Sequence, residues 1–526
     1  MGNSFLKYIF IFIVSIILIV AFWRVISNSN KVDNSSLDQT STINTIQKDL
    51  RFGIAQLDTM NPIVSHNRNV QELSKIIFEP LINLNENYKK EYCLAESVEK
   101  ESDTSYKVNL RKDIKWSDGT PFTADDVKFT VDSIKDGNVN SIYQANLSAV
   151  VGLATIDDNS VRFTLANPVD YFEYYLTFPI LSSKYYEGTN ILDGEKNIAP
   201  LGTGMFAFAN VNGNVYYLDK NPNYWNKNKD PLVEHIIISC YPSIGEVYNA
   251  FKSGDLDLVI SKTKNVDQYV GTIGHSKVEY KNRKYDFLVF NTAYSFFTDP
   301  QVRKAISLVI DRNNIIATSL GPGYSSSNFS LDMGHWLYTK DLNIGTDIDQ
   351  ARNILTQAGW KYSGNAWYKN GQRLEFTISV NNADAVKMAA ATNIVNQLAN
   401  FGINTSIVQI SNNNYGNILN QKSYQCIITG IECDFSPSID FFFGDNNLAN
   451  YDNPEIKGLI NESKNTNEEN VIYNDYNRIF DIYLEEAPYI GLYRETQSII
   501  YNNGFIGNIV PNSFNIFYTI NQWYRQ

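Results

Sequence analysis

Hydrophobic and polar residues follow two different periods along most of the chain. Alternation with period two predicts half-buried strands, because successive strand side chains point to opposite faces. The segments with this pattern are residues 50–57, 106–110 and 403–410. Helical spacing is found over residues 70–78, 349–358 and 385–401. Gly359 and Gly402 follow the last two helices at the position where glycine commonly ends a helix. Strands and helices that interchange in this way indicate an α/β protein with at least two lobes.

Residues 110–134 combine a strand, a turn and a helix start with an unusual number of carboxylates. The aspartates are Asp113, Asp118, Asp125 and Asp126. Residues 117–120, Ser-Asp-Gly-Thr, have the composition of a turn. Thr123 and Asp126 have the spacing of a capping box, and acidic residues favour the first turn of a helix. Gly137 is positioned to end the helix. We therefore interpret these aspartates as scaffold and not as an acidic catalytic or metal-binding centre.

An uncharged apolar run occupies residues 8–23, between Lys7 and Arg24. With its apolar flanks it approaches the length that spans a bilayer. We predict an uncleaved signal anchor, a transmembrane helix within residues 1–26; a cleaved signal peptide is the alternative. A polar, flexible linker is predicted over residues 27–48. The folded body would then lie outside the cytoplasm, at the bacterial cell surface.

Composition and charge exclude several classes of function. The net charge is −12, and no cluster of basic residues is available to neutralise phosphates, so nucleic acid is not an expected partner. The sequence contains none of the HExxH, GxSxG or phosphate-binding glycine motifs. The four histidines, which are isolated from one another, are His66, His235, His275 and His335. We expect no enzyme, no cofactor and no metal centre. Aromatic residues make up 13% of the chain, which suits a broad and partly polar binding surface.

The acid-rich segment also carries a family resemblance. WSDGTPFTADDV, residues 116–127, is similar to the signature of the family 5 extracellular solute-binding proteins of ABC importers, a group that binds oligopeptides, dipeptides and nickel. Further motifs stand in the order typical of that family. They are FEPL at 78–81, LAES at 94–97, LGTGMFAF at 201–208, NPNYW at 221–225, AFKSGDLDL at 250–258, FNT at 290–292, VRKAISLVIDR at 302–312, DIDQARNILTQAGW at 347–360 and EEAPYIGLY at 485–493. The resemblance covers residues 50–526 and is greatest for the oligopeptide-binding members.

This resemblance implies an α/β fold of the periplasmic-binding-protein type (type II, cluster C). Two lobes joined by crossing strands would close over a ligand in the cleft between them, and an extra small domain would adjoin the first lobe. The expected division is residues 49–78, 200–289 and 497–526 for lobe I, 79–199 for the small domain and 290–496 for lobe II.

The resemblance also directs attention to TGIECDFSPSIDFFF, residues 429–443. Asp434 falls where peptide-binding relatives pair an aspartate with the α-ammonium group of the peptide, a strong charge-assisted contact. The alternative is a structural role for Asp434 in a turn or helix cap before Pro437. The other ligand-binding residues that the resemblance implies are Gly430, Ile431 and Cys433 from the same segment, and His66, Asn67 and Tyr143 from cleft-lining positions.

The chain departs from the family pattern at two places. Ile431 replaces the usual tryptophan, and Glu432 adds a carboxylate. In the segment 379–388, where dipeptide binders have an arginine for the ligand's carboxylate, this chain has Asn381 and Asn382. These differences favour a longer peptide held mainly through its backbone.

We therefore expect the substrate-binding subunit of an ABC importer, a membrane-anchored monomer that captures oligopeptides and delivers them to a permease. Three alternatives remain open within the same fold. Nickel or metal-chelate binding is suggested only by the local group Cys426, Glu432, Cys433 and Asp434. The others are oligosaccharide binding and a receptor that senses peptides without transporting them.

Overall fold

The computed structural model describes residues 48–526, apart from residues 193, 264, 272, 339–341, 343, 344 and 467. The anchor predicted for residues 1–26 and all but the last residue of the predicted linker lie outside the described residues. Within the described part of the chain, none of the helices is both long and apolar enough to cross a bilayer.

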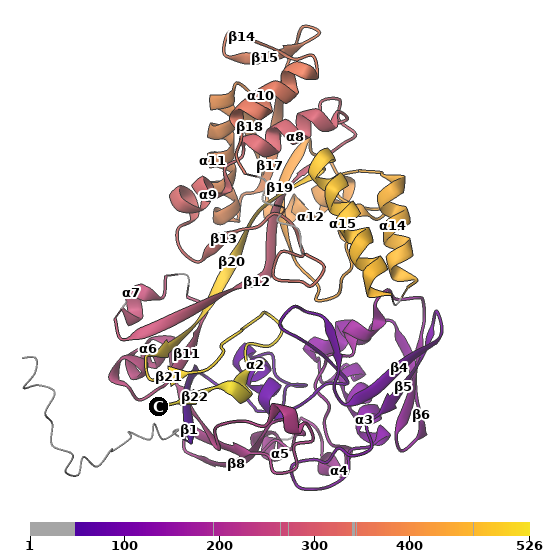
Figure 1. The fold of residues 1–526 in the computed structure, drawn as a ribbon, viewed down its shortest axis with the longest axis vertical. Coiled ribbons are helices and arrows are strands. Elements are labelled where there is room, and N and C mark those ends of the chain that lie inside the picture. The colour runs from indigo at the N-terminus through magenta and orange to yellow at the C-terminus, as the bar shows by residue number, and fades with distance from the viewer. Residues whose placement is uncertain are drawn as a thin grey trace, which may run out of the picture. The chain divides into compact units, whose positions relative to one another are not determined.

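Eleven of the described strands form one large mixed sheet (Figure 1). In spatial order they are β18 (Asn404–Ile410), β17 (Glu375–Asn381), β19 (Cys426–Glu432), β12 (His275–Phe290), β20 (Tyr489–Asn502), β11 (Leu258–Ser261), β1 (Asp49–Ala55), β10 (His235–Tyr241), β9 (Val215–Lys220) and β8 (Phe206–Asn212), while β13 (Tyr324–Ser326) pairs with β20. The long strands β12 and β20 pair antiparallel and connect two halves of the sheet. One half comes from residues 49–261 and the other from residues 375–432, as the resemblance to two-lobed proteins implied.

The β12–β20 pair is irregular at its middle. Lys281 lies opposite Thr496, but the next paired residues are Tyr285 and Arg494, so residues 282–284 bulge out of β12. A bulge of this kind bends a strand and re-aims its side chains. The irregular stretch lies where the two halves of the sheet meet.

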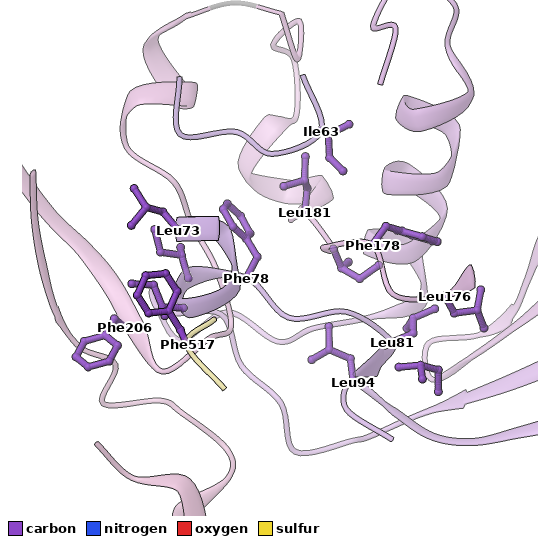
Figure 2. Packing of buried hydrophobic residues seen from close by; sticks show 14 of the residues in the cluster. Ile63, Leu73, Phe78, Leu81, Leu94, Leu176, Phe178, Leu181, Phe206 and Phe517 are labelled. Carbon is purple, nitrogen blue, oxygen red and sulfur yellow. The ribbon is translucent and has the colours of Figure 1, made fainter. Parts of the chain in front are cut away.

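A second, four-stranded antiparallel sheet belongs to the segment predicted as the small domain. Its order is β4 (Ala95–Ser102), β5 (Ser105–Leu110), β7 (Ser160–Leu165) and β6 (Val150–Asp157), and α3 (Ala124–Lys135) packs against β6 and β7. Its apolar residues share one hydrophobic cluster with the first half of the large sheet. Figure 2 shows part of that cluster, in which Leu73 and Phe78 lie near Phe206 and Phe517, with Leu81, Leu94 and Phe178 alongside.

Helices cover both halves of the large sheet. The longer ones are α2 (Arg68–Ile77), α6 (Ile244–Ser253), α8 (Pro300–Val309), α10 (Ile348–Gln357), α11 (Ala385–Phe401), α12 (Asn412–Gln421), α14 (Pro454–Lys464) and α15 (Glu469–Glu486). One-turn helices are α4 (Ser183–Tyr186), α5 (Gly194–Ile198), α7 (Asp267–Val270), α9 (Arg312–Ile315) and α13 (Asp440–Phe443). Short strands outside the two sheets are β2 (Ile82–Leu84), β3 (Lys90–Tyr92), β14 (Lys361–Ser363), β15 (Ala366–Lys369), β16 (Gln372–Arg373), β21 (Phe505–Ile506) and β22 (Tyr524–Arg525). Two further hydrophobic clusters fill the half built from residues 285–493.

The predictions that depend on local sequence patterns are confirmed, with small shifts in the bounds of the elements. Helix α11 has the predicted bounds, and Gly402 caps it with a φ of 94°. The first strand ends at Ala55 and not at residue 57, because Gln56 adopts a left-handed conformation with a φ of 58°. Helix α3 ends at Lys135, so Asp136 and not Gly137 is its C-cap.

Candidate ligand-binding cavity

A cavity of about 750 Å³ lies at the junction of the two sheet halves. One wall is the face of α2 that carries Arg68, Glu72 and Lys75, and the irregular middle of β12 and β20 also lines the cavity. Glu432 at the end of β19, Asp434 and Phe435 form another side, and residues from 142–146 and 174–177 line it from the segment of the small sheet. Cavities of about 300–1,000 Å³ are typical of sites for small ligands.

Three of the residues predicted to bind a ligand line this cavity: His66, Tyr143 and Asp434. His66 is exposed, and its Nε2 lies 2.8 Å from the carbonyl oxygen of Asn140. The hydroxyl of Tyr143 donates to Oε1 of Gln71 at 2.6 Å, and burial raises its pKa above the usual value. The fold thus brings residues from sequence positions 66, 143 and 434 to one space.

Asp434 is solvent-exposed within the cavity and accepts two hydrogen bonds. The hydroxyl of Tyr175 donates to its Oδ2 at 3.2 Å, and the backbone N–H of Ser436 donates to its Oδ1 at 3.1 Å. The second bond is the turn contact that the alternative interpretation expected. Among the described residues, no basic side chain lies within ion-pair distance of Asp434. The carboxylate therefore combines a local turn contact with an unneutralised charge that faces the cavity.

The other four predicted residues lie outside the cavity lining. Asn67 caps α2 by accepting a hydrogen bond from the backbone N–H of Asn69. Gly430 packs against Asp286, whose Oδ1 would lie 2.1 Å from a Cβ atom at this position. Ile431 packs against a hydrophobic cluster, and Cys433 is buried beside Arg494. Asn67 thus belongs to the α2 wall, whereas Gly430, Ile431 and Cys433 lie in or next to β19, just before Asp434. The predicted contact of these four residues with ligand stays a prediction.

The bulge in the crossing strands supplies lining residues that sequence reasoning missed. Residues 282–284 and 495–497 face the cavity. Lys284 pairs with Glu495 at 3.1 Å, and Arg283 lies 3.5 Å from Glu432. These two ion pairs neutralise the charges at the back of the cavity. No local pattern could have indicated them, because they depend on the register shift between β12 and β20.

The α2 wall carries more positive than negative charge. Arg68, Glu72 and Lys75 project from this helix, and Lys262, just after β11, lines the same space. Arg68 lies 3.4 Å from Glu72 and donates to Oε1 of Gln497 at 3.0 Å. Burial raises the pKa of Glu72, and burial lowers the pKa of Lys75 to about 8. Loss of hydration also lowers the pKa of Lys262 to about 8, with repulsion from Arg68 adding to the effect, although the side chain is exposed.

Three of the aspartates of residues 110–134, Asp118, Asp125 and Asp126, have the predicted structural roles. The capping box of α3 is present, with the backbone N–H of Thr123 donating to Oδ2 of Asp126 at 2.9 Å. Asp126 is buried and also accepts hydrogen bonds from Trp116 and from Ser183. Asp118 accepts from the backbone N–H of Thr120 in the predicted turn. None of the aspartates in this segment lines the cavity.

The described residues contain no group of three or more histidine, cysteine or acidic side chains that could hold a metal ion. All four cysteines are free thiols. Cys426 and Cys433 are buried, and burial raises the pKa of both thiols. The four residues that suggested metal binding, Cys426, Glu432, Cys433 and Asp434, therefore do not form a metal-binding group in this structure.

Comparisons with known proteins agree with this architecture. The sequence model of the bacterial extracellular solute-binding proteins, family 5 (middle region), matches residues 91–452. The oligopeptide-binding protein AppA of Bacillus subtilis is 23% identical over 518 residues, which are 91% of this chain and 92% of AppA. The MppA periplasmic murein tripeptide binding protein in its unliganded open form superposes with a TM-score of 0.76 at 18% identity, over 91% of this chain and 97% of MppA. A nickel ABC transporter protein from Bacillus halodurans gives a TM-score of 0.74 at 19% identity, over 91% of this chain and 100% of that protein.

The similarity to solved structures shows the two-lobed fold, and the match to the family's sequence model shows that the chain is a member of the family. The matched region covers more than half of the 526 residues and includes the segment that carries Asp434. The family's extracellular designation places its binding domain outside the cytoplasm. The chain therefore belongs to the bacterial extracellular solute-binding proteins of family 5, the solute-binding proteins of ABC importers.

Proposed function

We propose that the protein captures peptides, most suitably oligopeptides, in the cavity between its two halves and delivers them to an ABC permease. The observation that carries this proposal is the carboxylate of Asp434, which faces the cavity without a basic partner among the described residues. A peptide α-ammonium group would supply the missing positive charge in a charge-assisted hydrogen bond. The resemblance to the oligopeptide-binding protein AppA supports the same ligand class.

Capture requires contact with both walls. A ligand shifts a protein toward the closed form only through its higher affinity for that form. A peptide held by Asp434 on one side and by the α2 wall on the other would have this preference. The crossing strands β12 and β20 are the natural hinge, because they connect the two halves and are irregular at their middle.

The first test compares peptide affinities by isothermal titration calorimetry. The probes are alanine-based peptides of increasing length with free termini. We expect Asp434→Ala to weaken the tightest of them at least tenfold, a loss of about 1.4 kcal/mol or more. The matched control is Asp445→Ala, which removes an aspartate whose side chain is 88% exposed and paired with Lys457. Equal peptide affinity in Asp434→Ala and the unmodified protein, with both folded, would remove Asp434 from the site.

The ligand class is tested by native mass spectrometry of the purified chain. Co-purified peptides of mixed mass would support the proposal. A bound metal chelate or an oligosaccharide would replace it with one of the alternatives, of which nickel is the ligand named for a structural relative. A peptide-sensing receptor would also bind peptides, so a deletion strain is needed to distinguish it from a transport protein. Deletion of a receptor would alter a cellular response to peptide without reducing peptide uptake.

Anchoring and oligomeric state are part of the proposal. The apolar run of residues 8–23 would hold the protein at the membrane, with the binding body outside the cytoplasm as a monomer. Alkaline extraction of membranes distinguishes an inserted anchor from a cleaved signal peptide. Release of a shortened chain into the soluble fraction would contradict the anchor.

A further inference from the structure

A second hollow, which we call the side pocket, is lined by the segment of the small sheet and by helices α14 and α15. Its volume is about 640 Å³, within the range of sites for small ligands. One side comes from residues 89–106 and 168–174, and the other from Trp336, Pro437 and residues of α14 and α15. Among the described residues, Tyr174 alone lines both the side pocket and the cavity that holds Asp434. The side pocket is therefore a separate space to which both halves of the molecule contribute.

The charges of the side pocket neutralise one another. Four lysines and four acidic residues line it among the described residues, and each lysine forms an ion pair with one of these acids. The pairs are Lys89–Glu469, Lys90–Glu173, Lys100–Asp103 and Lys464–Asp170, with N–O distances of 2.6–2.7 Å. A charged ligand would find its opposite charge already paired here. The side pocket therefore favours a neutral ligand, in contrast to the cavity that holds Asp434.

Aromatic rings make up much of the remaining lining. They are Tyr92, Tyr106, Tyr171, Phe172, Tyr174 and Trp336. Tyr92 in β3 is 41% exposed and packs against no other aromatic ring among the described residues. Trp336, from the other half, is partly exposed, and its ring stacks on His335 with the centroids 6.1 Å apart. Rings of this kind offer flat apolar faces to a ligand.

Tyr106 in β5 adds a polar group without a partner. Only 7% of this residue is exposed, and its ring packs on Phe172 with the centroids 4.7 Å apart. Its hydroxyl has no hydrogen-bond partner among the described residues, although Tyr106 lines the side pocket. Burial raises the pKa of this hydroxyl, so it stays protonated and can both donate and accept. Because the polar groups of buried side chains are as a rule hydrogen-bonded, we expect the partner to come from the pocket.

Flat apolar faces beside neutral donors and acceptors match a sugar ring. The C–H face of a sugar packs on an aromatic ring, and the hydroxyl groups at its edge both donate and accept hydrogen bonds. The paired carboxylates and the amide of Asn461 offer further partners for these hydroxyl groups. A purely apolar ligand would displace water from the same polar groups without replacing its hydrogen bonds.

We propose that the side pocket binds a neutral saccharide, with Tyr92 and Trp336 contacting the faces of its rings and Tyr106 bonding one of its hydroxyl groups. The saccharide would contact both halves of the molecule, so it would stabilise the form in which they lie together. By linkage it would raise the affinity for peptide, and peptide would raise the affinity for the saccharide by the same factor. Only this coupling rests on the proposed capture of peptides, and the saccharide site does not.

The test is isothermal titration calorimetry of the full chain, in a detergent without a sugar headgroup. The neutral probes are maltotriose, cellotriose and the trimer of N-acetylglucosamine. Two charged probes are compared with them: the trimer of glucosamine, which is cationic, and the trimer of galacturonic acid, which is anionic. We expect the tightest neutral trimer to bind at least tenfold more tightly than either charged trimer.

Two variants locate the binding site. Tyr92→Ala removes an exposed ring and should weaken the tightest neutral trimer at least tenfold. Tyr106→Phe removes only the unpartnered hydroxyl and should weaken it at least threefold, with an unchanged melting temperature. The controls are Tyr368→Ala, at a 37% exposed position in β15, and Tyr217→Phe in β9, neither of which lines the side pocket. Both controls should bind the trimer like the unmodified protein, and all four variants should keep their peptide affinity within twofold when no sugar is present.

The coupling is measured with the tightest alanine-based peptide. A saturating concentration of the neutral trimer should raise its affinity at least threefold in the unmodified protein and not in Tyr92→Ala. Trimer binding that is weakened in Tyr92→Ala and Tyr106→Phe but leaves peptide affinity unchanged would remove the coupling and keep the site.

Three results would overturn the saccharide site. They are no binding of any neutral trimer, equal binding to the unmodified protein and to Tyr92→Ala and Tyr106→Phe, and competition between trimer and peptide, which would place the sugar in the cavity with Asp434. The first two leave peptide capture standing. If no peptide binds the unmodified protein, peptide capture is wrong, and the titrations with sugars still decide the side pocket.

Discussion

Arg494 lies in β20, next to the cavity-lining Glu495, and is fully buried. Its Nε donates to Oδ1 of Asp332 at 2.9 Å, and its Nη atoms donate to the backbone carbonyls of Asn282 and Ser330, among others. One guanidinium group therefore ties β20 to the bulge of β12 and to the loop that carries Asp332. Because arginine offers five donors in a fixed plane, no other side chain can satisfy all these acceptors.

At the residue scale we therefore predict that Arg494→Met destabilises the fold strongly. Removing one partner of a buried ion pair costs about 3–5 kcal/mol, since the remaining charge and the carbonyls are left unsatisfied. The free energy of unfolding from urea denaturation should fall by that amount. The control is Arg478→Met, which breaks an exposed ion pair with Glu455 and should cost less than about 1 kcal/mol. Similar losses in the two variants would contradict a special role for Arg494.

The elements that form the cavity are positioned by a close backbone approach. Gly202, in the LGTG segment before β8, lies against the C-terminal end of α2. A Cβ atom at this position would lie 1.8 Å from the carbonyl oxygen of Ile77. The backbone N–H of Gly204 donates to the same oxygen at 2.8 Å, so this oxygen cannot move away without breaking a bond. The two glycines thus fix α2, the helix that carries Lys75.

We predict that Gly202→Ala destabilises the protein by about 1–3 kcal/mol, because an inserted methyl group forces the helix end and the loop apart. Peptide affinity should fall as well, since α2 forms one cavity wall. Gly416→Ala is the control, for which we expect a change in stability of the opposite sign. Gly416 is exposed in α12, and a Cβ atom there would meet nothing within 4 Å. That substitution should stabilise by about 0.5–1 kcal/mol. Thermal melts of both variants measure the difference, and a Gly202→Ala variant as stable as Gly416→Ala would contradict the packing argument.

Whether an element or site residue could be predicted from the sequence depends on how close together in the chain the residues that determine it lie. The helix at 385–401 and the capping box at Thr123 depend on neighbouring residues, and both were predicted. Asp434 was reached through the family resemblance and indeed lines the cavity. Lys75 and Lys262 gave no signal, because each is an ordinary polar position within its own element. They line the same cavity only because the fold brings α2 and the end of β11 to one space, which no short pattern encodes.

At the scale of the folded body, the two halves also meet away from the cavity. We define the latch as three contacts between residues 89–171 and helices α14 and α15. They are Lys89 with Glu469 at 2.7 Å, Asp170 with Lys464 at 2.7 Å, and the hydroxyls of Tyr171 and Tyr476 at 3.4 Å. A small buried cluster also joins the two halves, because Tyr88 and Tyr174 share it with Met333. Rotation about β12 and β20 that widens the cavity would have to stretch these contacts.

We therefore predict that breaking the latch weakens ligand binding without touching the cavity. Each exposed or half-buried ion pair contributes about 0.2–1 kcal/mol, so removing both should lower peptide affinity about two- to thirtyfold by depopulating the closed form. The variant is Lys89→Met with Lys464→Met, measured by titration calorimetry at low and high ionic strength. Salt screens such pairs, so affinity of the unmodified protein should fall more steeply with salt than that of the variant. Lys128→Met controls for the loss of a surface charge, because Lys128 pairs with Asp132 on α3 and does not line the cavity. Unchanged peptide affinity and unchanged salt dependence in the double variant would mean that the latch does not stabilise the closed form. The closed form would then be stabilised by the contacts of the peptide with both walls alone.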